Sequence, residues 1–316
     1  MAKIIRNSKT GNYLVFFATE KKFINDWNKY TNISAILYAK KNNLGIILID
    51  HELISRESLY YKKAVWQKFL IPNYISENYK NIKNICYIDC DIIINPSAPN
   101  IFKEYDFDKI LVTSVRKGMP YTFKEATRKI SFLRKKFLKK NFPMNTSLVM
   151  TLEETYKHHN LPILNDEFCS GVWGCNIKKF APFFKKAFFK YKLPLWSVTN
   201  GGEQTHFNYE VIKSNNYEVI DYKYQTLWCY EVAVKYPFLY KNFKMNINSK
   251  LISDCITSSL FSSYFLHFAG TWPDAKCFYN TKIYNNDFFK KYFFEYKVYE
   301  DKKIKAKPKG AVKFYK

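Results

Sequence analysis

Two aspartates one residue apart have the spacing in this chain that most directly suggests chemistry. Asp89 and Asp91 flank Cys90 at the end of an apolar stretch that begins at Ile85. In an extended backbone, residues i and i+2 point to the same side, so both carboxylates can face one cation. Hard oxygen ligands of this kind suit Mn²⁺ or Mg²⁺ that is also held by phosphate groups. The simpler interpretation is that both are turn formers, a common role of Asp at a strand end.

Later segments carry further residues of this kind. In the strand predicted over residues 167–177, Gly171 and Gly174 allow close approach of another backbone or a ligand. An acid and an amide, Glu203 and Gln204, stand where residues 199–205 open a helix, and a late strand over 264–270 ends in His267-Phe-Ala-Gly. Both residues also have simpler interpretations. Glu203 caps its helix, since acids favour the first turn. His267 is only a hydrogen-bonded histidine, as is common for a lone histidine at a strand end.

The elements that must position these residues alternate in type. Apolar strands are predicted over 12–17, 44–50 and up to Asp89, with helices over 20–41 and 57–75, the second broken or kinked at Pro72. Strands that are apolar throughout and joined by helices imply a parallel sheet covered on both faces. The first third of the chain is therefore predicted to be a β-α-β-α-β half of Rossmann type, in an α/β fold.

After Asp91 the pattern continues with short strands over 92–94 and 110–114 and a short helix over 101–104. Residues 122–141 form a strongly basic helical segment. Its apolar positions follow helical spacing and are Phe123, Ala126, Ile130, Leu133 and Phe137. This helix lies either on a membrane surface or packed against the sheet. His158, His159 and His206 are expected to be surface or core residues.

Composition limits the class of protein. The 316 residues, 47% of them hydrophobic, can bury one good-sized core. Seven cysteines form no Cys-x-x-Cys pair, which favours buried free thiols in a reducing, cytoplasmic compartment. Neither a signal peptide nor a membrane-spanning segment is expected, so any membrane contact would be peripheral.

A formal net charge of +24 predicts attraction to polyanions. The candidate partners are nucleic acid, an anionic membrane surface and a phosphorylated small molecule. The sequence contains no nucleic-acid-binding motif, and solvated lysine faces explain much of the charge. The Gly-rich signatures of dinucleotide-binding and P-loop proteins are also missing. A nucleotide site would therefore need a metal bridge and basic side chains.

Taken in this order, the segments resemble a GT-A glycosyltransferase of the type represented by glycogenin and lipopolysaccharide galactosyltransferases. The resemblance extends from Tyr13 to Lys276 and implies a mixed, mostly parallel sheet flanked by helices. It implies hexosyl transfer from a nucleoside diphosphate donor, most typically a UDP-sugar, to a glycan, lipid-linked or protein acceptor. Residues 1–276 would form the catalytic domain, and residues 277–316 a helical, lysine-rich extension.

The resemblance also implies roles for individual residues. Asp89, Asp91 and His267 match the family's metal ligands, and Cys90 lies between the two acids. Glu203 and Gln204 match the acid-amide pair near the transferred sugar, with Asp166 as an alternative acid. The donor-binding candidates are Ala18, Thr19 and Glu20 at the base, Lys68, the triplet Asp89-Cys90-Asp91, and Lys276. Lys276 comes later after Gly270 than the family pattern places its lysine.

Two other functions compete with this interpretation. A nucleotidyltransferase could use a similar sheet and acidic pair, but it usually adds a Gly-rich basic loop after the first strand, where this chain has Phe-Ala-Thr-Glu. A basic membrane- or nucleic-acid-binding module would explain the charge but not the ordered acidic and histidine motifs. Retention or inversion at the sugar does not follow from the sequence.

Overall fold

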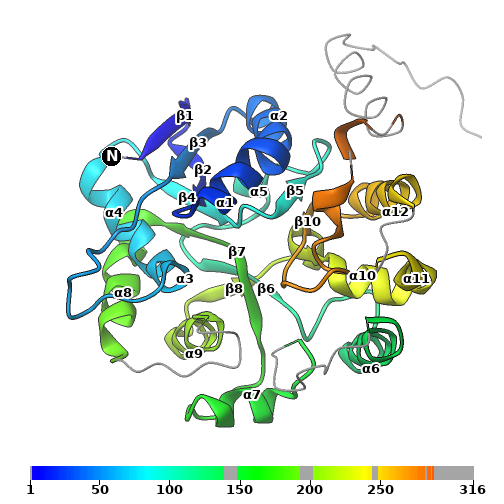
Figure 1. Cartoon of the computed structure of the whole chain (residues 1–316). Coiled ribbons are helices and arrows are strands. Elements are labelled where there is room, and N and C mark those ends of the chain that lie inside the picture. The colour runs from blue at the N-terminus through cyan, green and yellow to red at the C-terminus, as the bar shows by residue number, and fades with distance from the viewer. Residues whose placement is uncertain are drawn as a thin grey trace, which may run out of the picture.

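A seven-stranded sheet forms the centre of the molecule, with strand order β1-β3-β2-β4-β7-β6-β8 (Figure 1). The computed structural model describes residues 2–138, 148–192, 202–243, 248–281, 283–285 and 287. The strands are β1 Lys3–Arg6, β2 Asn12–Phe17, β3 Gly45–Ile49, β4 Asn84–Ile88, β6 Ile110–Ser114, β7 Phe168–Asn176 and β8 Tyr217–Val219. Strands β3, β2 and β4 are mutually parallel, β6 is parallel to β8, and β1 and β7 run antiparallel to their neighbours. The predicted α/β class with a mixed, mostly parallel sheet is confirmed.

Helices cover both faces of this sheet, as the apolar strands predict. The helices are α1 Lys21–Asp26, α2 Asn32–Asn42, α3 Ala64–Gln67, α4 Ile71–Asn78, α5 Ile101–Glu104, α6 Phe123–Leu133, α7 Leu152–His158, α8 Ile177–Lys190, α9 Gln204–Ser214, α10 Trp228–Lys235, α11 Tyr240–Phe243 and α12 Ser249–Ser262. Alternate residues of β2 face opposite ways: Val15 packs in one cluster with α3, α4, α8 and α9, and Leu14 packs in another with α2.

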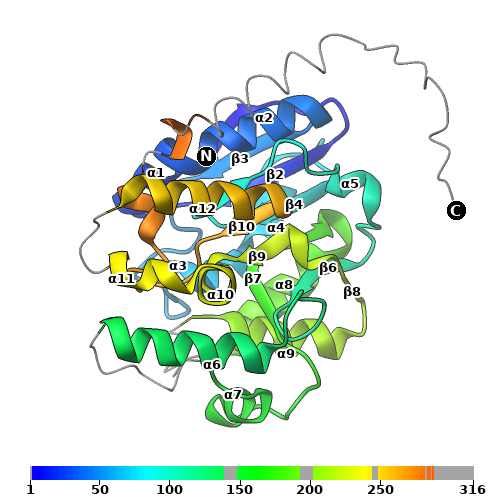
Figure 2. The ribbon, with the colours of Figure 1, turned by 90° about the vertical axis from the view of Figure 1, so that its right-hand side faces the viewer.

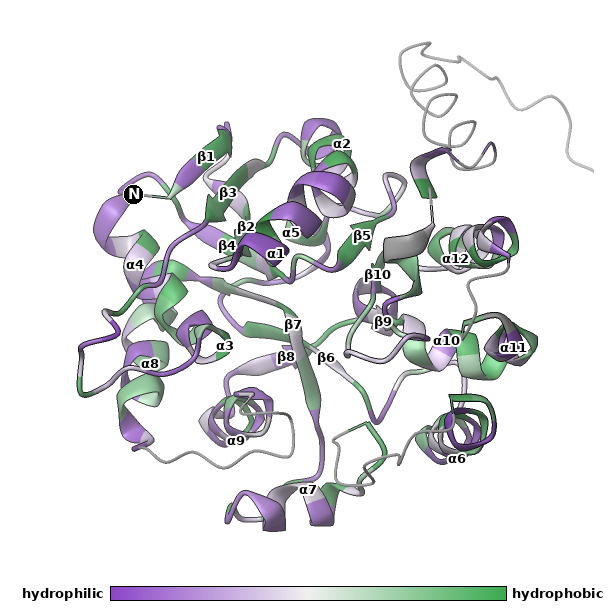
Figure 3. Ribbon diagram, in the orientation of Figure 1, coloured by the Kyte–Doolittle hydropathy of each residue, from purple (hydrophilic) through white to green (hydrophobic). Residues whose placement is uncertain are grey.

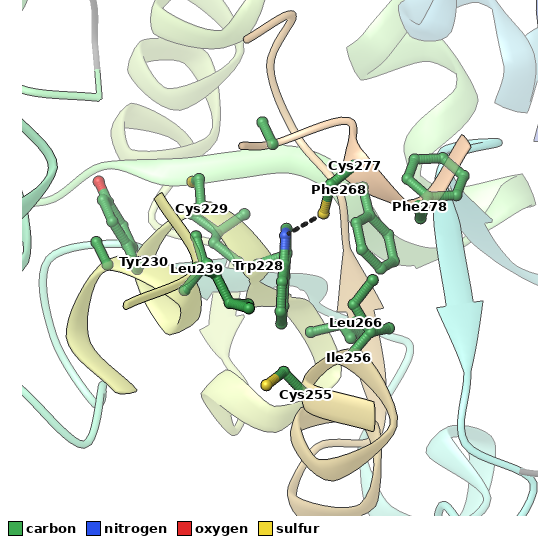
Figure 4. Close-up of a cluster of buried hydrophobic side chains, with 14 of the residues drawn as sticks. Trp228, Cys229, Tyr230, Leu239, Cys255, Ile256, Leu266, Phe268, Cys277 and Phe278 are labelled. Atoms are coloured by element: carbon green, nitrogen blue, oxygen red, sulfur yellow. Dashed lines mark hydrogen bonds between the residues drawn. The ribbon is translucent and has the colours of Figure 1, made fainter. Parts of the chain in front are cut away.

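A second, three-stranded sheet stands beside the main one. It consists of β5 Ile92–Ile94, β10 Phe265–His267 and β9 Thr226–Leu227, in the order β5-β10-β9. A third apolar cluster joins it to the helices α6, α10 and α12 (Figure 4). Within that cluster, Trp228 Nε1 donates to Cys277 Sγ at 3.1 Å, and the rings of Phe268 and Phe278 lie 4.3 Å apart.

The division of the chain after residue 276 stays a prediction. Cys277, Phe278 and Ile283 are buried in the same cluster as Trp228. Residues 288–316, which make up most of the predicted extension, lie outside the described residues.

The helix predicted over residues 57–75 is wrong in its first part. Residues 56–60 form turns and a bend, and residues 61–63 have no regular structure; Ser58 N–H donates to the Ser55 carbonyl and Tyr61 N–H to that of Ser58. The two serine hydroxyls also accept bonds from nearby backbone N–H groups, and such bonds compete with helix formation. Pro72 does mark a change: it stands in the first turn of α4, where proline is tolerated, directly after a 3₁₀ turn over Lys68–Leu70.

Helix α6 is packed against the protein, mainly against α10 (Figure 2). Its residues Ala126, Ile130 and Leu133 are buried in the cluster that contains Trp228, so this apolar face is not available to a membrane. Both hydrophobic and hydrophilic residues lie along the helix (Figure 3). Residues 139–141 of the predicted helix are outside the described part of the chain.

Two further expectations can be compared with the structure. All seven cysteines are free and buried, as predicted. Within the described ranges, no helix has both the length and the apolar character needed to cross a bilayer.

Candidate metal centre and its surroundings

The pairing of two sheets brings Asp89, Asp91 and His267 together. Asp89 follows β4 in the main sheet, and Asp91 precedes β5 in the small sheet. Because β10 pairs antiparallel with β5, His267 stands opposite Ile92, and Phe268 N–H donates to the Asp91 carbonyl at 3.0 Å. The three residues each offer a ligand atom, and these atoms lie within 4.8 Å of one another. The structure thus joins the three residues that the sequence analysis assigned to a metal.

Positive side chains surround the two carboxylates. His267 Nε2 lies 3.2 Å from Asp91 Oδ1 and 3.8 Å from Asp89 Oδ2. Lys68 Nζ lies 2.9 Å from Asp89 Oδ1, and Lys276 forms an ion pair with Asp91 Oδ2. Burial opposes the charge of Asp91, but Lys276 and His267 outweigh it and hold the pKa of this carboxyl well below its usual range. Burial likewise opposes the charge of His267, yet Asp91 raises its pKa to about 10.

The residues present fit a divalent cation. Asp91 Oδ1 and His267 Nε2 lie 3.2 Å apart, and together with an oxygen of Asp89 they are close enough for one cation to contact all three residues. Two carboxylates and an imidazole provide the oxygen and nitrogen ligands that Mn²⁺ accepts and that Mg²⁺ tolerates.

Neighbouring side chains and the backbone hold Asp89 and Cys90 in place. The Tyr87 hydroxyl donates to Asp89 Oδ1 at 2.5 Å, and Asp89 N–H donates to the Gly171 carbonyl at 2.8 Å. Thr31, in a π-helical segment over Trp27–Thr31, donates its hydroxyl to the Cys90 carbonyl. Such π segments are frequent at functional sites, and this one separates α1 from α2 inside the predicted helix over 20–41.

Gly171 on β7 leaves the space that the metal cluster occupies. A Cβ at this position would lie 2.4 Å from His267 Cε1 and 2.9 Å from Asp89 Oδ2. A ligand or another backbone was expected to approach Gly171, and side chains of the candidate metal site do so.

Glu203 does not cap its helix. It occupies the N-cap position of α9, but its side chain makes no cap hydrogen bond. Instead, Oε1 accepts from the Ser170 hydroxyl at 2.6 Å and lies 3.3 Å from Lys68 Nζ. Lys68 therefore bridges Asp89 and Glu203, and both acids raise its pKa although burial opposes the charge. This bridge connects the metal centre to the acid that the sequence analysis placed near the sugar.

Gln204 and Asp166 belong to an adjoining polar cluster. Gln204 Nε2 donates to Glu167 Oε1 at 3.1 Å, and Arg116 Nε donates to Glu167 Oε2 at 2.9 Å. Burial raises the pKa of Glu167, although Arg116 opposes the shift. Asp166 accepts from the Ser114 hydroxyl at 2.6 Å and lies 3.3 Å from Lys117 Nζ. A catalytic role for Asp166 stays a prediction.

One cavity borders the metal centre. Several of the predicted donor-binding residues line it together with apolar and aromatic side chains; the lining residues are Phe17, Thr19, Phe23, Ala64, Val65, Lys68, Tyr87, Asp89, Cys90 and Asp91. Ala18 is buried, and its N–H already donates to the Ile49 carbonyl at 2.9 Å. Glu20 is exposed at the start of α1. Of the predicted base-binding segment, only Thr19 faces this cavity.

Sequence reasoning did not single out three residues that support the site. Tyr87 could have been found, because it lies on β4 two residues before Asp89. Glu167 gave only a weak signal as a charged residue at the start of an apolar strand. Gln225, whose Nε2 lies 3.2 Å from His267 Nδ1, has no local signal, since 42 positions separate the two residues.

Comparisons with known proteins found similar structures only. No family model matches the sequence, and no curated protein matches it. The chain is similar to a glycosyltransferase involved in the glycosylation of the major capsid of PBCV-1, with a TM-score of 0.46 and 14% identity over 85% of this chain and 98% of that chain. It is also similar to the glycosyltransferase GlyE of Streptococcus pneumoniae TIGR4, in its apo form, with a TM-score of 0.40 and 12% identity over 93% of this chain and 64% of that chain. For the bifunctional glycosyltransferase WbbM the TM-score is 0.41 and the identity 10%, over 92% of this chain and 52% of that chain.

Proposed function

We propose that this protein is a glycosyltransferase that moves a sugar from a nucleoside diphosphate donor, preferentially a UDP-sugar, to a hydroxyl group of a glycan, lipid-linked or protein acceptor. The observation that carries the proposal is the cluster of Asp89, Asp91 and His267, whose ligand atoms lie within 4.8 Å of one another beside a cavity. A Mn²⁺ or Mg²⁺ ion bound there would offset the negative charge that develops on the leaving diphosphate.

Two lysines of the site suit the same leaving group. Lys68 and Lys276 each contact one carboxylate of the cluster, so their ammonium groups are already positioned around the place where a diphosphate would bind. Preorganised positive charge of this kind stabilises a developing anion without proton transfer. Apolar and aromatic residues of the cavity, such as Phe23 and Val65, provide the surface on which part of the nucleoside would rest.

Glu203 is the proposed acid on the sugar side. It is 3% exposed, and its contact with Lys68 places it next to the metal centre without making it a ligand. In an inverting reaction Glu203 would accept the proton of the acceptor hydroxyl, and in a retaining reaction it would orient the transferred sugar. The anomeric configuration of the product distinguishes these two roles.

A screen of donor hydrolysis tests the proposal without a known acceptor. Purified protein is incubated with a set of nucleotide sugars, with Mn²⁺ or with EDTA, and release of the nucleoside diphosphate is measured. The wild type should hydrolyse one donor in the presence of Mn²⁺ only, and Asp91→Asn should abolish that activity. Asp254→Asn, which removes an equal charge from an ion pair on α12, is the matched control and should behave like the wild type. The proposal fails if no donor is hydrolysed or if EDTA has no effect.

The role of Glu203 has its own test. Glu203→Gln preserves the shape of the side chain and leaves the metal cluster intact, so UDP-Mn²⁺ affinity measured by calorimetry should stay close to wild type. Sugar transfer should fall by a factor of about a hundred or more, a typical loss for a positioned acid-base group. Transfer at the wild-type rate, or loss of nucleotide binding, would contradict the assigned role.

A further inference from the structure

Gln225 lies behind the histidine of the candidate metal centre. It ends a 3₁₀ turn over Tyr222–Gln225, directly before β9, and it is completely buried. Its amide nitrogen Nε2 lies 3.2 Å from His267 Nδ1 and would be 2.7 Å from a Cβ at position 171. Its amide oxygen Oε1 is also buried but has no hydrogen-bond partner. A buried carbonyl without a partner costs about 1–3 kcal/mol, so its presence beside a functional histidine calls for an explanation.

The proton on His267 shows which amide atom should face the ring. Nε2 points to Asp91 and Asp89, so it is the nitrogen that can bind a cation. A neutral imidazole that binds a metal through Nε2 carries its proton on Nδ1. In that metal-bound state Nδ1 is a donor, and it needs an acceptor rather than another N–H.

The acceptors close to Nδ1 differ in strength. Cys169 Sγ lies 3.7 Å from Nδ1, and sulfur accepts hydrogen bonds only weakly. The amide of Gln225 is closer and carries a carbonyl. Because the nitrogen and oxygen of a side-chain amide have nearly the same shape, a half-turn about the last bond exchanges them within the same space. That turn gives the buried carbonyl a donor and gives Nδ1–H an acceptor.

We propose that Gln225 is a positioning residue whose side-chain carbonyl accepts the Nδ1 proton of His267 and thereby directs Nε2 at the metal. The inference rests on the proposed metal-dependent function. Metal-bound histidines generally donate their other ring N–H to a carboxylate or carbonyl, and loss of that partner costs 10- to 100-fold in metal affinity or activity. Gln225 supplies this partner from the segment Tyr222–Gln225. Within the described part of the chain, this segment forms no hydrogen bond or ion pair with either aspartate of the cluster.

Two substitutions separate an acceptor role from a packing role. Gln225→Met keeps the length of the side chain but removes the acceptor, whereas Gln225→Glu keeps an acceptor and adds a charge. We expect Gln225→Met to weaken Mn²⁺ binding 10- to 100-fold and Gln225→Glu to bind Mn²⁺ at least as tightly as the wild type. A packing role predicts the opposite order, since methionine fills the site and a buried carboxylate disturbs it. Binding is measured without nucleotide, from the electron paramagnetic resonance signal of free Mn²⁺, and thermal unfolding confirms that each variant is folded.

A second measurement uses diamagnetic Mg²⁺ in place of Mn²⁺. In Mg²⁺-saturated protein labelled with ¹⁵N-histidine, the His267 Nδ1 resonance, assigned with His267→Asn, should be that of a protonated nitrogen. An unprotonated Nδ1, wild-type Mn²⁺ affinity in folded Gln225→Met, or equal losses in both folded variants would each overturn the inference. Donor hydrolysis by the wild type is scored separately. If it requires Mn²⁺ while Gln225→Met binds the metal normally, only the role of Gln225 is wrong and the proposed function stands.

Discussion

Replacement of Gly171 by alanine should weaken metal binding strongly, beyond the effect of its modest loss of protein stability. A Cβ at this position would lie 2.4 Å from His267 Cε1, 2.7 Å from Gln225 Nε2 and 2.9 Å from Asp89 Oδ2. Optimal contacts between carbon atoms are about 3.5–4.0 Å, so the imidazole must move by roughly 1 Å or the strand must yield. These three atoms belong to two residues of the candidate metal site and to Gln225.

The expected loss of Mn²⁺ affinity follows from how much overpacking a buried site tolerates and how far a metal ligand can move. Overpacking a buried site typically costs about 1–3 kcal/mol, which lowers the melting temperature of Gly171→Ala by several degrees. Metal-ligand distances tolerate deviations of only about 0.2 Å, so a ring displaced by roughly 1 Å no longer completes the cluster. If the same 1–3 kcal/mol is lost from binding, Mn²⁺ affinity falls by about 5- to 150-fold.

Gly174→Ala is a matched control on the same strand. A Cβ there would lie 2.7 Å from Phe107 Cε1 and 3.3 Å from the Ile85 carbonyl oxygen, so it overpacks the core without contacting the cluster. Calorimetric titration with Mn²⁺ and thermal unfolding of both variants form the assay. We expect both to melt earlier but only Gly171→Ala to bind Mn²⁺ weakly. Normal Mn²⁺ affinity in a folded Gly171→Ala, or an equal loss in both variants, would refute the reasoning.

Two further predictions concern charged groups. Lys276→Met removes an ammonium group that competes with a cation for Asp91, so Mn²⁺ affinity without nucleotide should rise by roughly tenfold, whereas UDP affinity in the presence of Mn²⁺ should fall. Both affinities are measured by calorimetry. A decrease in both would show that Lys276 is needed to hold the site together. Burial, with His159 and Lys190, lowers the pKa of His206 to about 3 from its ordinary value of 6.5. Below pH 6.5 the unfolded chain binds a proton on this histidine and the folded protein does not, so the free energy of unfolding decreases as the pH falls from 6.5 toward 3. The decrease is about 2 kcal/mol between pH 6.5 and 5.0. His206→Phe should therefore lose less stability than the wild type between pH 7.5 and 5.0 in urea denaturation, and equal losses would assign the acid sensitivity to other groups.

The sequence alone was enough to predict those features that depend on short-range backbone geometry. The strand over Asn12–Phe17, the short helix over Ile101–Glu104 and the strand that ends just before Asp89 follow from local periodicity and propensity. Local signals also misled, because the apolar spacing after Glu57 suggested a helix where serine side chains stabilise turns instead.

Contacts between distant segments were decided by the tertiary structure. Lys276 meets Asp91 across 185 positions of the chain, and Glu203 turns away from its own helix toward Lys68. Neither contact leaves a periodic trace in the sequence, because sheet pairing and side-chain packing create them only when the chain is folded. The carboxylate pair is therefore a property of one strand end, whereas His267 and Gln225 join it through the pairing of β10 with β5 and β9.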